Sequence, residues 1–294
     1  MVGVIKWATK SRVNLGSERD ADIDMTSKDD TGIRLATMNA LEVGWETHAR
    51  RHTCMLCWNE GQSPLRQYDN GATCCLIRTR VRRFLITCAH VWSAFESFSS
   101  KRSNAHLWLS LVASDLPSAP AIPFKVRNPS LIAAHDGLDL ATCAFDGIDS
   151  LEAWGFCNLG GTPAVRQGDI VHFLGYPGDG VRAGIPLLTL NYCFTSRTIH
   201  DVGHTQFILH DQHGTVHHTN RQRGSNPPFR AGGERGAPVF KVTTDFTLEL
   251  VGIVSKLSSS GLTSGGATPH EMSDGDVYIT HTSFIQPDGS ITPP

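Results

Sequence analysis

Short apolar runs bounded by turn residues recur along most of the chain, a pattern typical of β-strands. After the Asn70-Gly71 turn signal, residues 72–77 and 84–87 form two apolar runs, joined by a basic connection over residues 78–83. Further strand candidates follow at residues 168–178, 187–194, 205–210 and 249–255. The pattern predicts a mostly β protein, in which residues 280–284 form a final helix or strand.

The N-terminal part has a different pattern. Residues 1 to about 32 are polar and charged, which is typical of a loose arm. Between Ile33 and Arg51, apolar side chains recur at helical spacing and predict a short helix. These apolar positions are Leu35, Met38, Leu41 and Trp45. We therefore expect residues 1–65 to form an N-terminal extension, made of the arm and this helix.

Composition agrees with a β-rich globular protein. Of the 294 residues, 40% are hydrophobic and 18% are charged, so the chain can bury a core. The 28 glycines and 15 prolines indicate many turns, as short strands require. A chain of this length fits one large domain or two barrels that share one site.

Charge and hydropathy restrict the classes of partner. A net charge of −2 and a pI near 6.7 give no electrostatic basis for binding nucleic acid. No apolar run approaches the ~20 residues of a membrane span, and the first residues lack the apolar stretch of a signal peptide. We therefore expect a soluble cytoplasmic protein that uses no cofactor and binds no membrane.

The eight cysteines could form disulfides or remain free thiols. Several lie inside apolar strand-like runs, as Cys74 and Cys75 do. Without a secretory signal, buried free thiols in a reducing compartment are the favoured interpretation.

His52, Cys54 and Cys57 have the spacing of half a tetrahedral zinc site. No second Cys-x-x-Cys follows, and His48 is the only other candidate ligand nearby. Because a structural zinc ion needs four ligands, an incidental pair of cysteines is favoured. We therefore predict no metal, and a zinc-assisted protein is the weakest alternative.

Three segments contain residues suited to catalysis. Residues 232–240 read Gly-Gly-Glu-Arg-Gly-Ala-Pro-Val-Phe, residues 86–91 read Ile-Thr-Cys-Ala-His-Val, and residues 138–141 read Leu-Asp-Leu-Ala. Gly233 permits a strained turn that aims backbone N–H groups at a substrate carbonyl, and Gly236 leaves room beside its neighbour. Each segment alone also fits an ordinary turn or strand end, so the interpretation depends on their combination.

Together these segments resemble those of the trypsin/chymotrypsin-like serine peptidases, in which histidine, aspartate and nucleophile follow in this order. The Gly-Tyr-Pro at residues 175–177 also recurs in bacterial-type members of that family. The resemblance covers roughly residues 68–285 and implies an all-β, chymotrypsin-like double β-barrel. The first barrel would span residues 66–155 and the second, with the glycine-rich loop and the pocket strand, residues 156–294.

The resemblance also implies a role for each matching residue. The resemblance places His90 at the end of a strand, facing the cleft. His90 would take the nucleophile's proton and Asp139 would hold the imidazole in place. Backbone N–H groups at Gly233 and Arg235 would form the oxyanion hole. The substrate would be a peptide or protein segment. Its predicted binding residues are Phe229, which suggests an apolar pocket, and Ile253, Val254 and Ser255 on one pocket wall.

The sequence departs from the family at the nucleophile, where Arg235 replaces serine. A guanidinium with a pKa above ~12 is neither nucleophile nor base at neutral pH. Losing the serine of such a triad typically costs on the order of 10⁶ in turnover, which is about 8 kcal/mol of barrier. Ser225 offers another hydroxyl upstream, but nothing in the sequence places it at the turn.

We therefore expect an endopeptidase homologue that is inactive in this form. We expect Arg235 to pair with His90, Asp139 or Glu234 and to fill the catalytic cleft. The alternative is a non-enzymatic pseudopeptidase that binds a protein or peptide segment in the cleft.

Overall fold

The computed structural model describes residues 40–61, 70–112, 121–151, 155–159, 164–176, 181–183, 188–190, 192–209, 216–218, 235–257 and 276–294. The chain divides into two units, Met1–Leu41 and Glu42–Pro294. The barrels and the site described below all belong to the second unit. The predicted arm over residues 1–32 lies outside the described residues.

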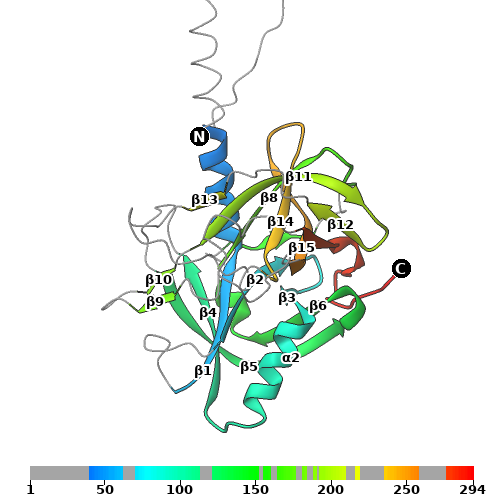
Figure 1. Cartoon of the computed structure of the whole chain (residues 1–294). Helices are drawn as coiled ribbons and strands as arrows, with labels where there is room; N and C mark the ends of the chain where they lie inside the picture. Colours follow the sequence, from blue (N-terminus) through cyan, green and yellow to red (C-terminus); the bar gives the residue numbers. More distant parts are fainter. Residues whose placement is uncertain are drawn as a thin grey trace, which may run out of the picture. The chain divides into compact units, whose positions relative to one another are not determined.

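Six of the described strands close a first antiparallel β-barrel (Figure 1). They are β1 (Cys54–Glu60), β2 (Asn70–Arg78), β3 (Arg83–Thr87), β4 (Ala105–Val112), β5 (Ala121–His135) and β6 (Leu140–Asp146). Their order is β4-β1-β2-β3-β6-β5, and the pairing of β4 with β5 closes the barrel. Short strands extend this sheet: β7 (Cys157–Asn158), which pairs with β2, and β9 (Val181–Ala183) and β10 (Leu188–Leu190), beyond β5.

A second barrel, in the green to red part of Figure 1, is closed by six further described strands. They are β8 (Ile170–Gly175), β11 (Cys193–Val202), β12 (Gln206–Leu209), β14 (Pro238–Val242), β15 (Leu248–Leu257) and β16 (Val277–His281). Their order is β12-β16-β15-β14-β8-β11, and β11 closes the barrel by pairing with β12. The short strand β13 (Val216–His218) pairs with β11.

The two closed barrels match a chymotrypsin-like double barrel, so the predicted all-β fold class is confirmed. The predicted end of the N-terminal extension at residue 65 differs from the structure, because β1 pairs with β2 and β4 inside the first barrel. Residues 54–59 of β1 are all buried. Residues 54–58 form a short continuous apolar run, as a strand buried on both faces requires. In the sequence this run was considered only as half of a zinc site.

The described residues contain few helices. The predicted N-terminal helix is present over residues 40–52, and its predicted first residues, 33–39, lie outside the described part. The helix α2 (Ala89–Ser99) was not predicted; it follows β3 and packs Val91, Trp92 and Phe95 against the core of the first barrel. Three short 3₁₀ helices are η1 (Asp136–Leu138), η2 (Ile148–Leu151) and η3 (Thr282–Phe284), the last directly after β16.

Strand β1 separates two apolar clusters, and its two cysteines face different ones. Cys57 packs in one cluster and Cys54 in the other. Side chains three positions apart on a strand point to opposite faces, so this pair does not converge on one ion. The zinc alternative built on His52 and these cysteines therefore lacks its ligand geometry. The described cysteines are buried free thiols: Cys54, Cys57, Cys74, Cys75, Cys88, Cys143 and Cys157.

Thr73, in the middle of β2, joins the two barrels. Its hydroxyl accepts a hydrogen bond from the backbone N–H of Tyr176 at 2.9 Å, directly after β8. Its backbone N–H donates to the carbonyl of Arg235 at 3.2 Å, just before β14. Its own carbonyl accepts from the Thr87 hydroxyl at 3.1 Å. One fully buried residue therefore ties the ends of two second-barrel segments to the strand pair that precedes His90.

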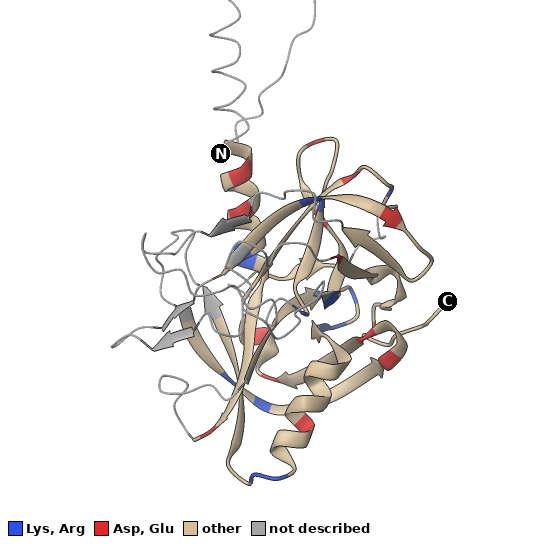
Figure 2. Cartoon of the chain, in the orientation of Figure 1, with Lys and Arg blue, Asp and Glu red and all other residues tan. Residues whose placement is uncertain are grey.

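Charged residues are interspersed over the described ribbon in Figure 2, with Lys and Arg lying among Asp and Glu on both barrels. A mixed surface of this kind agrees with the small net charge of −2. Among the described residues, no helix has both the length and the apolar character needed to span a membrane.

The burial of His172 predicts that the stability of the fold depends on pH. Its ring stacks on Phe194 with centroids 5.6 Å apart, and its Nδ1 lies 2.7 Å from the Ser196 hydroxyl. Burial lowers the pKa of His172 from 6.5 to about 4. Between these values the unfolded chain binds more protons than the folded one, so stability falls as the pH falls. The full effect of this one group is about 3 kcal/mol.

Chemical denaturation at pH 7 and pH 4.5 measures this effect. We expect H172F, which keeps an aromatic ring but cannot titrate, to lose less unfolding free energy than the wild-type chain over the same pH step. Equal losses in the two proteins would show that His172 is not responsible.

Candidate active site

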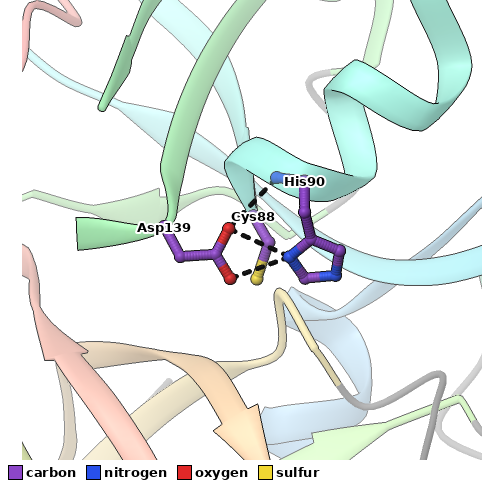
Figure 3. Close-up of side chains that lie close together, drawn as sticks. All are labelled: Cys88, His90 and Asp139. Carbon is purple, nitrogen blue, oxygen red and sulfur yellow. Dashed lines mark hydrogen bonds and ion pairs between the residues drawn. The ribbon is translucent and has the colours of Figure 1, made fainter. Parts of the chain in front are cut away.

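His90 and Asp139 form a close pair between segments far apart in the sequence (Figure 3). The imidazole Nδ1 lies 2.9 Å from one carboxylate oxygen of Asp139 and 2.8 Å from the other. The backbone N–H of His90 also donates to the carboxylate, at 3.1 Å. Because the carboxylate binds Nδ1, it fixes the ring orientation and leaves Nε2 for another partner. The His90 side chain is 43% exposed, so a ligand can reach it.

His90 lies in the first turn of α2, rather than at the end of a strand as predicted. The strand β3 ends at Thr87, Cys88 has the extended backbone of a helix N-cap, and α2 begins at Ala89. A helix N-terminus leaves backbone N–H groups without intrahelical acceptors, and here the Asp139 carboxylate accepts one of them. One carboxylate therefore holds both the ring and the backbone of His90.

Asp139 occupies a strained position between η1 and β6. Its φ of 50° is in the left-handed region, which is uncommon for residues other than glycine. The preceding turn is held by His135, whose Nδ1 accepts from the Leu138 N–H at 3.1 Å. The Thr280 hydroxyl of the second barrel donates to the Leu138 carbonyl at 2.8 Å. The second barrel thus helps to hold the turn that presents Asp139.

Cys88 lies beneath the pair but is not placed to act as a nucleophile. Its side chain is fully buried, and its thiol donates to the Val254 carbonyl at 3.2 Å. Burial raises the pKa of the Cys88 thiol well above its ordinary value, and the neighbouring charge of Asp139 raises it further. The nearby charge of Arg235 and the N–H of Gly236 act in the opposite direction. Cys88 therefore remains a protonated thiol at neutral pH.

The turn at residues 235–236 lies against the strands that precede His90. Gly236 has a φ of +89°, and a Cβ atom there would fall 2.0 Å from the Thr73 carbonyl oxygen and 2.8 Å from the Thr87 hydroxyl. Its N–H donates to the Val254 carbonyl at 2.8 Å. Glycine is required both for the backbone angle and for the close approach. In Figure 3, the gold ribbon that enters β14 passes beside the labelled side chains.

Arg235 is the first described residue of this turn and is half-buried. Its backbone is fixed by the bond from Thr73, while its Nε atom is buried and has no hydrogen-bond partner. Its charge lies close enough to Cys88 to affect that thiol. Within the described residues no ion pair joins Arg235 to His90 or Asp139, and the expected pairing of Arg235 stays a prediction. Glu234 lies outside the described residues.

Cys88, His90 and Asp139 are also a possible set of metal ligands, since their donor atoms lie within 4.8 Å of one another. The distances favour hydrogen bonding instead. The imidazole and carboxylate are in direct contact at 2.8 Å, and the thiol already donates to Val254. Ligands around a zinc ion sit about 2.0–2.3 Å from the metal and so lie farther apart than this pair. The absence of a metal stays a prediction.

The predicted substrate-binding residues are located as follows. Ile253 and Val254 in β15 are fully buried, and the Val254 N–H and carbonyl both bond to the segment 235–237. The hydroxyl of Ser255 donates to the Tyr278 carbonyl at 3.1 Å and accepts from Gln206. These side chains and the backbone groups of Val254 are therefore all engaged within the fold, and their role in substrate binding stays a prediction. Gly233 and Phe229 lie outside the described residues.

Sequence reasoning missed Thr73, Thr87 and Cys88 as supports of the site. The residues just before His90 were recognised only as part of the motif. A threonine that bonds backbone groups far away in the sequence gives no periodic signal. The contact of Gly236 with the Thr87 hydroxyl could be found only in the structure.

Comparisons with known proteins give limited information. No protein-family model matches the chain, and no curated protein matches it. Among solved structures, the crystal structure of Deg5 matches with a TM-score of 0.47 and 11% sequence identity. That match covers 74% of this chain and 86% of the other. So distant a likeness supports no functional argument, and the fold assignment rests on the strand order of the two barrels.

Proposed function

We propose that this chain is a trypsin-like serine endopeptidase homologue that has lost its nucleophile and does not hydrolyse peptide bonds in this form. The single observation that carries the proposal is the His90–Asp139 pair, in contact at 2.8 Å, beside a glycine-dependent turn that begins with Arg235. An imidazole oriented by a carboxylate is the acid–base part of such an enzyme.

The chemistry that remains is proton transfer without covalent attack. A guanidinium stays protonated and cannot attack a carbonyl carbon. The only cysteine that contacts the pair in the described residues is the buried, protonated Cys88. A water molecule activated by His90 would hydrolyse peptides only slowly, since the residual rate after loss of the serine is on the order of 10⁶-fold below that of the intact triad.

The alternative is a pseudopeptidase that binds a peptide or protein segment at the same site. In the part of the chain that the structure describes, the buried Nε of Arg235 has no hydrogen-bond partner, which favours this alternative because a ligand would supply one. The free cysteines support a reducing compartment, the cytoplasm, for either function.

A fluorophosphonate probe followed by peptide mass spectrometry tests the proposal. We expect no labelling of the wild-type chain and covalent labelling of R235S at position 235, lost again in the double variant R235S/H90A. Labelling of the wild-type chain would reveal a different nucleophile, such as Ser225, and would overturn the proposal.

A further inference from the structure

Among the described residues, no carboxylate forms an ion pair with Arg235. The Arg235 carbonyl accepts a hydrogen bond from the Thr73 N–H at 3.2 Å, and the next residue, Gly236, packs closely against Thr73 and Thr87. The backbone from which the Arg235 side chain extends is therefore fixed. The guanidinium Nε is buried and makes no hydrogen bond. A buried donor without a partner costs free energy, and the cost is larger for a charged group. This side chain is therefore ready to accept an anionic partner.

The carboxylate of Asp139 contacts His90 rather than Arg235. Both oxygens of Asp139 bind the Nδ1 of His90, and one of them also accepts the backbone N–H of that residue. The turn that carries Arg235 lies beside the residues that lead to the pair. A Cβ atom on Gly236 would fall 2.8 Å from the Thr87 hydroxyl, and the Gly236 N–H donates to the same Val254 carbonyl that accepts from Cys88. Arg235 and the exposed imidazole of His90 are therefore carried by segments that meet at one site.

We infer that this site binds a carboxylate group of a peptide, with Arg235 as the group that recognises it. The inference deepens the proposed function and rests on it for the peptide nature of the ligand. A guanidinium binds a carboxylate through two parallel N–H···O bonds, which an ammonium cannot reproduce. The carboxylate can come from a peptide C-terminus or from an acidic side chain, and both present the same planar group.

The experiment is a titration of the full wild-type chain with three pools of N-acetylated random tetrapeptides. One pool ends in a free carboxylate, one ends in an amide and lacks acidic residues, and one ends in an amide but contains one glutamate. The readout is the NMR cross-peak of the Arg235 Nε–Hε group, assigned by its absence in R235K. We expect saturable shifts, with the neutral amide pool binding at least about tenfold more weakly than the best carboxylate pool.

Two variants control for the charge change. Because R235Q lacks the Arg235 cross-peak, its binding is followed through the backbone amide cross-peak of the next residue, Gly236. R235Q is expected to weaken binding of the carboxylate pools at least about tenfold, to the level of the neutral pool. R102Q makes the same charge change at a residue just beyond the C-terminal end of α2, the end opposite His90, where Arg102 pairs with Glu60. It is expected to leave binding unchanged. Comparison of the pool with a free C-terminal carboxylate and the amide pool that contains glutamate distinguishes a C-terminal carboxylate from an acidic side chain.

Equal binding of the carboxylate and neutral pools would overturn the inference. So would unchanged binding by R235Q, or no saturable shift up to about 10 mM peptide. None of these results bears on labelling of R235S by a fluorophosphonate, so failure of the carboxylate site and failure of the proposed function remain distinguishable.

Discussion

R235S is expected to hydrolyse activated esters at least about 10³-fold faster than the wild-type chain. The reason is that the substitution supplies a hydroxyl to an acid–base pair that is already assembled, with the His90 Nδ1 bound to Asp139 at 2.8 Å. Loss of serine from an intact triad costs on the order of 10⁶, which sets the upper limit of the gain. The assay is steady-state hydrolysis of p-nitrophenyl esters of N-acetylated amino acids.

The matched control is R235A, which removes the guanidinium without adding a nucleophile and should show no gain. The double variant R235S/D139N should lose most of the gain, by a factor of up to about 10⁴ and down to the R235A rate, because the imidazole would then favour the wrong tautomer. Equal rates for R235S and R235A would mean that position 235 is not next to the imidazole, and the interpretation of Arg235 as a replaced nucleophile would be wrong.

G236A is expected to destabilise the fold by at least about 3 kcal/mol, the largest stability effect we predict. Two causes add at this position. Its φ of +89° is unfavourable for any residue with a Cβ atom, and that atom would fall 2.0 Å from the Thr73 carbonyl oxygen. The backbone of β2 would have to move, and Thr73 also holds Tyr176 and Arg235.

G168A provides a control with the same backbone angle. Gly168 has a φ of +88°, and a Cβ atom there would meet nothing within 4 Å. We expect G168A to cost about 1–2 kcal/mol, the part due to φ alone. Urea denaturation of both variants measures the difference. If both variants lost the same free energy, the contact between the turn and Thr73 would be absent in solution.

Much of the β-architecture could be predicted from the sequence, because alternating and apolar runs between turn residues are strong local signals. The helix α2 was missed although Val91, Trp92, Phe95 and Phe98 follow a helical spacing. Because the resemblance placed the end of a strand at His90, the helical spacing of these apolar residues was not interpreted as a helix. The strand β1 was assigned to the N-terminal extension although residues 54–58 form an apolar run, because the spacing of His52, Cys54 and Cys57 was interpreted as a candidate metal site.

The residues of the candidate site could be predicted from the sequence, but the hydrogen bonds that hold them in place could not. The order of His90, Asp139 and the glycine-rich turn suggested that they converge, and the structure brings His90 and Asp139 together, while their catalytic roles stay predictions. The environment of Arg235 could not be predicted, because which partner a long side chain reaches depends on the tertiary packing around it. The supporting bonds of Thr73 and Thr280 are likewise tertiary contacts without a sequence pattern.

The central claim is that position 235 lies beside an imidazole that a carboxylate already orients. A crystal structure of R235S tests it directly, through the distance between the introduced hydroxyl oxygen and the His90 Nε2. We predict a separation of about 2.6–3.2 Å, with Nδ1 still bound to Asp139. A separation beyond about 5 Å, or an imidazole turned away from Asp139, would contradict the account.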